Sequence, residues 1–252
     1  MRFRMHKWYL DCVTASGEAA IVYSAQLHWG VLRLGYSAVI LAELGHEPDQ
    51  RQTWRTDPPR PDGQELRWAS SRLGAEGCWK QLDPGPEVQL HDGIRWRCHQ
   101  PGGPARLRLG SGRVLTGLGY AEELTLELPP WRLPFDELRW GRFIADAGAP
   151  AMAWIQWRKG LERGWCFQGR QTLDLDECTA DRVRFPQGRI VLPPRRPLRE
   201  GFLLRELLGA GAELCPGPLR MAHESKRLSR GTLEDGTGFW EGWVIHERVQ
   251  LR

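Results

Sequence analysis

Polar and apolar residues alternate with a period of two over many short segments of this chain. The clearest examples are GIRWRCHQ (93–100), ARLRLG (105–110), TLDLDE (172–177) and DRVRF (181–185). In an extended chain this alternation puts apolar side chains on one face and charged side chains on the other. The pattern predicts half-buried antiparallel strands, with arginines and His99 on the solvent face.

Turn sequences separate these segments, among them ASGE (15–18), HDG (91–93) and EDGTG (234–238). Helical periodicity is scarce, and residues 198–214 favour either a short helix or a further pair of strands. Many short strands at close spacing are typical of sandwiches and barrels. The fold class predicted from these patterns is all-β.

The chain repeats itself. GLGYAE (117–122) is echoed by GTGFWE (236–241), and residues 12–29 are echoed by 143–160, with Gly17 matching Gly148. A proline-rich segment near residue 130 separates the two halves. We therefore expect two antiparallel β-barrel lobes packed together, residues 1–130 and 131–252, with few helices.

Composition narrows the possible functions. Thirteen tryptophans in 252 residues indicate a thick aromatic core or an aromatic-lined cavity. The formal net charge is +4, and arginine accounts for 31 of the 35 basic residues. Because no basic run is longer than Arg195–Arg196, we expect no nucleic-acid partner.

Cysteines, histidines and apolar runs give further expectations. The six cysteines lack C-x-x-C spacing, and neither an export signal nor an apolar run of membrane-spanning length is present. These features predict a reduced, cytoplasmic protein without an integral membrane segment. The histidine spacing matches no metal-binding motif, so no metal site is expected. The sequence does not predict an oligomeric state.

Three blocks, KWYLDCVTASGEAAIVYSAQL, GLGYAEELTLELPPWRLPFDELRWGRF and GTGFWEGWVIHE, resemble the bilobal lipocalin-like family. This family contains carotenoid hydratase (hydroxyneurosporene synthase), AttH-type proteins and natural-product cyclases. The resemblance implies two calycin-type barrels that hold an apolar small molecule of the polyene, prenyl or polyketide type. It also implies hydration, cyclisation or isomerisation by acid–base or conformational catalysis, with no cofactor.

Carboxylates on apolar strand faces are the candidate catalytic groups. Glu122 and Glu241 occupy the same place in the two GxG echoes, each on the face that carries aromatic residues. Burial raises the pKa of a carboxyl group, which could then protonate a C=C bond. Alternatively, each is a structural latch that satisfies a buried donor. Asp136, near the lobe junction, is a third candidate, or else a cap of the turn after Pro134.

Aromatic faces could stabilise a carbocation formed during such chemistry. The candidate ligand-binding residues are Tyr23, Tyr120, Trp140, Trp154, Trp157, Phe239 and Trp243. Two other functions stay open: a non-catalytic carrier of a lipid or pigment, and a ligand-free interaction module. An enzyme predicts a cavity with ionisable groups, a carrier predicts a purely apolar cavity, and an interaction module predicts a filled core with a surface aromatic patch.

Overall fold

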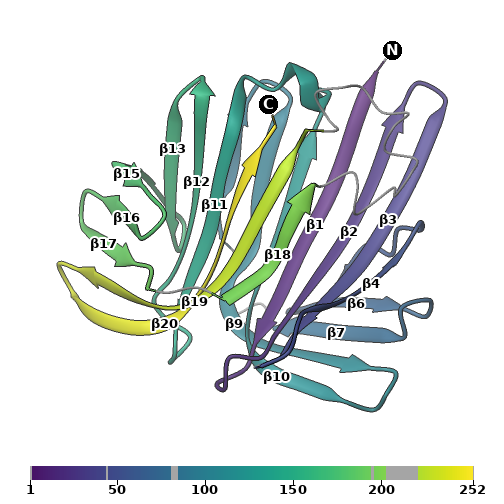
Figure 1. Cartoon of the computed structure of the whole chain (residues 1–252), viewed down its shortest axis with the longest axis horizontal. Helices are drawn as coiled ribbons and strands as arrows, with labels where there is room; N and C mark the ends of the chain where they lie inside the picture. The colour runs from purple at the N-terminus through teal and green to yellow at the C-terminus, as the bar shows by residue number, and fades with distance from the viewer. Residues whose placement is uncertain (1, 44, 81–84, 194–195, 203–220, 252) are drawn as a thin grey trace. The chain divides into compact units, whose positions relative to one another are not determined.

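The computed structural model describes residues 2–43, 45–80, 85–193, 196–202 and 221–251. Almost all regular structure in these residues is β-strand (Figure 1), and the one described helix is the short 3-10 turn η1 (Pro130–Arg132). The all-β prediction is confirmed. The segment 198–214 begins in strand β18, and its remainder lies outside the described residues.

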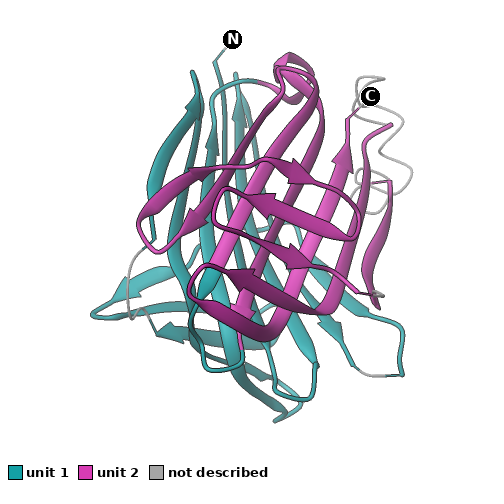
Figure 2. Ribbon diagram, turned by 90° about the vertical axis from the view of Figure 1, so that its left-hand side faces the viewer, with its two compact units in different colours: residues 1–128, 146–151 teal, residues 129–145, 152–252 magenta. Residues whose placement is uncertain are grey.

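Unit 1 comprises residues 1–128 and 146–151 (Figure 2). It is a curled antiparallel sheet with the strand order β4-β3-β2-β1-β10-β9-β7-β6-β5, and β8 pairs with the first half of β9. Its strands are β1 (Phe3–Val13), β2 (Ala19–Trp29), β3 (Leu32–Ala42), β4 (Asp49–Thr53), β5 (Arg60–Asp62), β6 (Glu65–Ser70), β7 (Ala75–Lys80), β8 (Glu87–His91), β9 (Ile94–Leu109) and β10 (Val114–Leu126).

Unit 2 comprises residues 129–145 and 152–252. Its order, β14-β13-β12-β11-β20-β19-β17-β16-β15 with β18 beside β19, is that of unit 1, which confirms the predicted repeat. Its strands are β11 (Phe135–Ala145), β12 (Ala151–Gly160), β13 (Arg163–Gln168), β14 (Gln171–Asp174), β15 (Glu177–Cys178), β16 (Arg182–Phe185), β17 (Gly188–Val191), β18 (Arg196–Phe202), β19 (His223–Asp235) and β20 (Gly238–Gln250).

The register of the repeat differs from the sequence echo at the GxG motif. A Cβ atom at Gly117 would lie 2.0 Å from the carbonyl oxygen of Val13, and one at Gly242 would lie 2.1 Å from that of Ile144. These two close approaches are equivalent, so Gly117 corresponds to Gly242. Gly236 instead lies in the turn between β19 and β20.

This register changes which glutamates correspond. Tyr9 pairs with Glu122 in unit 1, and Trp140 pairs with Glu247 in unit 2. Tyr9 and Trp140 occupy equivalent positions in the two halves, because they are separated by the same number of residues as Gly17 and Gly148. The structural counterpart of Glu122 is therefore Glu247, and the alignment of Glu122 with Glu241 is wrong.

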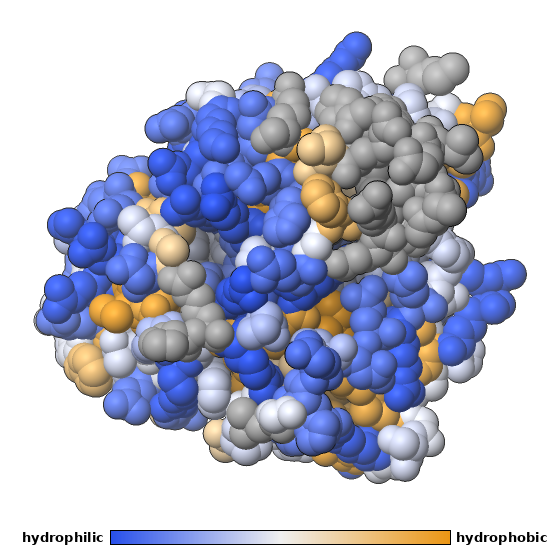
Figure 3. Space-filling view, in the orientation of Figure 1, coloured by the Kyte–Doolittle hydropathy of each residue, from blue (hydrophilic) through white to orange (hydrophobic). Residues whose placement is uncertain are grey.

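Each sheet packs apolar side chains into its concave interior. In unit 1 these include Trp8, Trp68 and Trp79, and in unit 2 Phe143, Trp154 and Phe185. Five tryptophans are fully buried, which confirms a thick aromatic core: Trp68, Trp79, Trp96, Trp154 and Trp157. On the face shown in Figure 3 the surface is mainly hydrophilic, with smaller apolar areas between the polar ones. Among the described helices, none has the length and apolar character needed to span a bilayer.

Candidate functional site

Glu122 acts as a hydrogen-bond acceptor for two buried aromatic side chains. Its Oε2 accepts hydrogen bonds from Trp96 Nε1 at 2.6 Å and from the Tyr120 hydroxyl at 2.8 Å. Burial, together with the Glu122 charge, raises the pKa of Tyr120 well above its ordinary value, so this phenol remains a donor. A structural latch was expected to satisfy buried hydrogen-bond donors in this way, and the donors here are the Trp96 N–H and the Tyr120 hydroxyl.

Glu241 does not point into an apolar interior. Its side chain is 64% exposed and pairs with Arg230 at 3.2 Å, and Phe239 is 62% exposed. The expected inward orientation of these two residues is wrong. Both lie on the outer face of β20, whereas Trp240 between them packs against the core of unit 2. Alternation therefore holds in this segment, and the sequence interpretation took the outer face for the inner one.

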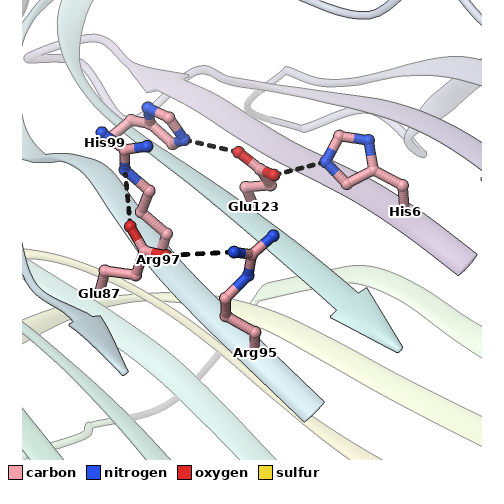
Figure 4. A network of polar contacts seen from close by, with 6 residues as sticks. All are labelled: His6, Glu87, Arg95, Arg97, His99 and Glu123. Carbon is pink, nitrogen blue, oxygen red and sulfur yellow. Dashed lines mark hydrogen bonds and ion pairs between the residues drawn. The ribbon is translucent and has the colours of Figure 1, made fainter. Parts of the chain in front are cut away.

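The interior carboxylate of β10 is Glu123 (Figure 4). His6 Nε2 and His99 Nε2 approach its two oxygens at 2.6 and 2.9 Å from β1 and β9, while Arg95 and Arg97 lie beside Glu87. Hydrogen bonds from the two histidines hold the pKa of Glu123 well below its ordinary value, although half-burial opposes them.

The sequence pattern predicted His99 on the solvent face and Glu122 as the inward carboxylate of this strand, and the structure corrects the first and adds Glu123 to the second. The Glu123 side chain is only 19% exposed, and His99 is buried against Trp8, with a ring separation of 4.5 Å. Strands β1 and β10 bury side chains on both faces over part of their length, so alternation alone does not identify their solvent face. Alternation holds over most of β9, but residues 98–100 are all buried next to a register irregularity in the β9–β10 ladder.

The Glu123 contacts predict a pH-dependent stability. Because the folded-state pKa is depressed, this stabilisation is complete above about pH 4.5 and is lost as the pH falls further. We expect the free energy of unfolding of the wild type to fall more steeply between pH 6 and pH 3 than that of Glu123→Gln. Urea unfolding at several pH values measures this difference. Glu127→Gln, at an exposed position, is the control, and parallel curves for wild type and Glu123→Gln would contradict the prediction.

In unit 2 the interior carboxylate is Glu137, whose side chain is 2% exposed. Its Oε1 accepts a hydrogen bond from Arg139 Nε at 2.8 Å, and its Oε2 accepts one from Arg248 Nη2 at 2.8 Å. Lys159 Nζ lies 3.8 Å away. Burial alone would raise the pKa of Glu137, but the hydrogen bonds from Arg248 and Arg139 outweigh it and lower the pKa.

Asp136 precedes Glu137 in β11 and belongs to the opposite face of that strand by alternation. Its backbone carbonyl accepts a hydrogen bond from the Leu251 N–H at 2.8 Å. The sequence analysis selected Asp136 and not its neighbour Glu137, because β11 buries side chains on both of its faces and alternation does not distinguish them.

The two interior carboxylates occupy related positions with the charges exchanged. In the ladder of β1 and β10, His6 is paired with Thr125 and bonds diagonally to Glu123. In the ladder of β11 and β20, Glu137 is paired with Gln250 and bonds diagonally to Arg248. The acid therefore lies on the last strand of unit 1 and on the first strand of unit 2.

Unit 2 has a cavity of about 270 Å³ on the interior face of its sheet. Trp154 and Leu192, both members of the apolar core, form part of the wall, and basic and polar side chains form much of the rest. The lining residues are Arg139, Trp140, Trp154, Cys178, Thr179, Ala180, Leu192, Glu200, His223, Ser225, Arg227, His246, Glu247, Arg248 and Gln250.

The histidines of this cavity were not candidates in the sequence. His223 and His246 lie on neighbouring strands, and their separation in the chain gives no metal or catalytic motif. His223 packs edge-on against Phe202 at 5.5 Å between ring centroids. The register of β19 against β20 brings both histidines to one cavity. Alternation within each strand is the sequence signal that could have placed them on a common face.

The aromatic candidates divide into several groups. Trp154 lines the cavity of unit 2 from the core side, and Trp140 borders it from the opposite face of β11, where Lys226 Nζ lies 5.3 Å from its ring centroid. Trp157 stacks on Phe135 at 4.7 Å, and Trp243 lies under the Arg230 guanidinium at 5.1 Å. Tyr23 and Tyr120 belong to unit 1, where each packs near Tyr9. The structure thus brings together two of the seven residues at this cavity.

A larger hollow of about 810 Å³ lies in unit 1. Much of its lining consists of exposed charged side chains of β6, β7 and β9, including the ion pairs Arg67–Glu65 and Arg108–Glu76. Ligand pockets are usually concave and enclosed, and this groove is more open to solvent than the cavity of unit 2, so it fits a binding site less well. Within the described ranges, no cluster of three or more His, Cys, Asp or Glu side chains is arranged to hold a metal ion.

Solved structures of two proteins resemble this chain over nearly its whole length. CghA with Sch210972 matches at a TM-score of 0.63 and 9% identity, covering 99% of this chain and 88% of CghA. An AttH-type protein from Nitrosomonas europaea matches at a TM-score of 0.57 and 12% identity, covering 98% and 92%. No protein-family model and no curated protein matches the sequence. The chain has the bilobal lipocalin-like fold.

Proposed function

We propose that this protein is a lipocalin-like enzyme that acts on a small molecule in the cavity of unit 2. The substrate is of the polyene, prenyl or polyketide type, and the reaction is a cofactor-independent hydration, cyclisation or isomerisation. The observation that carries the proposal is the lining of the cavity, which combines Trp154 and Leu192 of the apolar core with ionisable side chains. A carrier would need only the apolar part of this wall.

Proton transfer in this cavity is assigned to His223. Histidine is the side chain that enzymes use most often as a general acid or base near neutral pH. Glu137 is a weaker proton donor because two arginines hold it in its ionised form. Glu122 belongs to unit 1 and is not among the residues that line this cavity. His223 would take a proton from one carbon of the substrate and return it to another, which shifts a double bond.

The structural comparison agrees with a small-molecule function. A protein of the same fold, CghA, was crystallised with Sch210972. The surface of unit 2 supports the interaction module less well, because its exposed aromatic residues Phe202 and Phe239 pair with opposite ends of β19, at His223 and Glu234. Scattered aromatics do not form the contiguous patch that a protein-binding surface requires.

The first test is native mass spectrometry of the purified protein, followed by denaturing extraction of any bound molecule. We expect a polyene, prenyl or polyketide-type ligand, which the wild type converts on incubation. His223→Asn is expected to retain binding and lose conversion, and His91→Asn, in unit 1, serves as the control. Binding without conversion by the wild type would favour a carrier. A failure of the whole ligand panel to change the tryptophan fluorescence would reject a ligand-binding function.

A further inference from the structure

We propose that the cavity of unit 2 recognises an anionic oxygen group of its ligand, a carboxylate or an enolate, through Arg139 and Arg248. This inference rests on the proposed function, since it assumes that the cavity holds the substrate. It narrows the substrate class from apolar molecules in general to those with an acidic oxygen at one end.

The first observation is a concentration of positive charge. Arg139 and Arg248 are direct cross-strand partners in the ladder of β11 and β20. Like charges directly opposite each other destabilise a sheet unless they are compensated. Here a single carboxylate, Glu137, bonds to both guanidinium groups and also lies 3.8 Å from Lys159. Three cations share one anion, so this cluster keeps an excess of positive charge.

The other charged groups of the cavity compensate one another. Arg227 donates a hydrogen bond to Glu200, and Glu247 accepts one from Lys226. The uncompensated charge therefore belongs to the cluster around Glu137. A ligand that entered the cavity would meet this charge at Arg139 and Arg248, because both line the wall.

The second observation is a set of spare hydrogen-bond donors. A guanidinium group carries five N–H donors. Arg139 uses Nε for Glu137 and Nη1 for the carbonyl of Cys178, and Arg248 uses Nη2 for Glu137. Among the described residues, these are the hydrogen-bond partners of the two side chains. Arg248 is 47% exposed at its side chain, so its remaining donors are accessible to a ligand.

The two arginine side chains are held in place before any ligand binds. Glu137 is buried and holds each guanidinium by one hydrogen bond at 2.8 Å, which orients both side chains before a ligand arrives. Arginine binds planar carboxylates through two parallel hydrogen bonds and is therefore suited to this group. The apolar part of the ligand would lie against Trp154 and Leu192.

A purely hydrocarbon ligand fits this lining poorly. It would remove water from Arg248 without replacing the lost hydrogen bonds, which is unfavourable for a charged group. A molecule with both a conjugated chain and an acidic oxygen satisfies both parts of the wall. Of the three substrate types, the polyketide type, with its carboxyl or 1,3-dicarbonyl groups, fits this description best.

The test compares two probes of nearly equal shape, sorbate and sorbamide. Both carry a short conjugated diene, and only sorbate carries a negative charge at pH 7.5. Isothermal titration calorimetry with the full chain is expected to show sorbate binding at least about tenfold more tightly than sorbamide, the effect of one charge-assisted hydrogen bond. Arg248→Gln should weaken sorbate binding about tenfold and leave sorbamide binding unchanged.

Arg108→Gln, in the exposed ion pair with Glu76, is the matched control and should bind both probes as the wild type does. Arg248→Lys keeps the charge without the planar group and should give an intermediate affinity for sorbate. Circular dichroism of each variant establishes that it is folded. Equal affinities for the two probes, or sorbate binding that Arg248→Gln leaves unchanged, would overturn anion recognition while the ligand cavity stands. Binding of neither probe by the wild type overturns the anion site, and the extraction experiment then decides the proposed function separately.

Discussion

Glu137→Leu is expected to lower the free energy of unfolding by about 3–5 kcal/mol. The substitution removes the carboxylate that bonds to Arg139 and Arg248 and leaves two guanidinium groups facing each other across β11 and β20. Arg139 is largely buried, so water cannot fully replace the lost partner. Urea unfolding followed by tryptophan fluorescence and circular dichroism measures the change.

An exposed ion pair of the same unit supplies the control. Glu234 pairs with Arg189 at 2.7 Å, with both side chains more than half exposed. Glu234→Leu is expected to cost less than about 1 kcal/mol, as is typical of surface pairs. If the two substitutions had equal effects, burial of Glu137 would not be the source of its contribution.

Gly242→Ala is expected to destabilise the protein by about 3 kcal/mol, at the upper end of the cost of overpacking a core. A Cβ atom at this position would lie 2.1 Å from the carbonyl oxygen of Ile144, and backbone atoms cannot move aside as a flexible side chain can. The neighbouring strands β11 and β20 would have to separate locally. Thermal unfolding and urea unfolding both report this cost.

Gly236→Ala tests the same substitution a few residues away, where nothing lies within 4 Å of the added methyl group. We expect almost no change in the free energy of unfolding for this variant. The comparison would contradict the assigned register of β20 if Gly236→Ala were the more damaging substitution of the two.

Strand alternation and the internal repeat were sufficient to predict the fold class. The period of two in residues 181–185 matches β16, and the hairpin echo that matches Gly17 with Gly148 corresponds to β1–β2 and β11–β12. Both signals are local, because they depend on the strand and the turn that carry them. The GxG echo failed because Gly117 lies inside a strand at a close backbone approach, whereas Gly236 forms part of a turn.

The interior of each unit was harder to predict. Alternation separates the two faces of a strand but does not say which face is interior when both are buried, as on β10 and β11. Glu123 and Glu137 were therefore missed in favour of Glu122 and Asp136. The cavity of unit 2 also depends on the pairing of β19 with β20, which places His223 near Gln250 and His246 opposite Arg227.

The exchanged charges of the two interior pairs affect how the halves of this chain can be compared. His6 in unit 1 stands where Glu137 stands in unit 2, and Glu123 stands where Arg248 stands. An alignment of the halves counts these as two mismatches, although in both halves a carboxylate contacts a side-chain nitrogen diagonally across the strands. Both halves keep a pair in which a carboxylate contacts a nitrogen-bearing side chain, and they do not keep the residue type at either position. Methods that score residues one at a time will underestimate the relationship between such halves, and between distant proteins that share this fold.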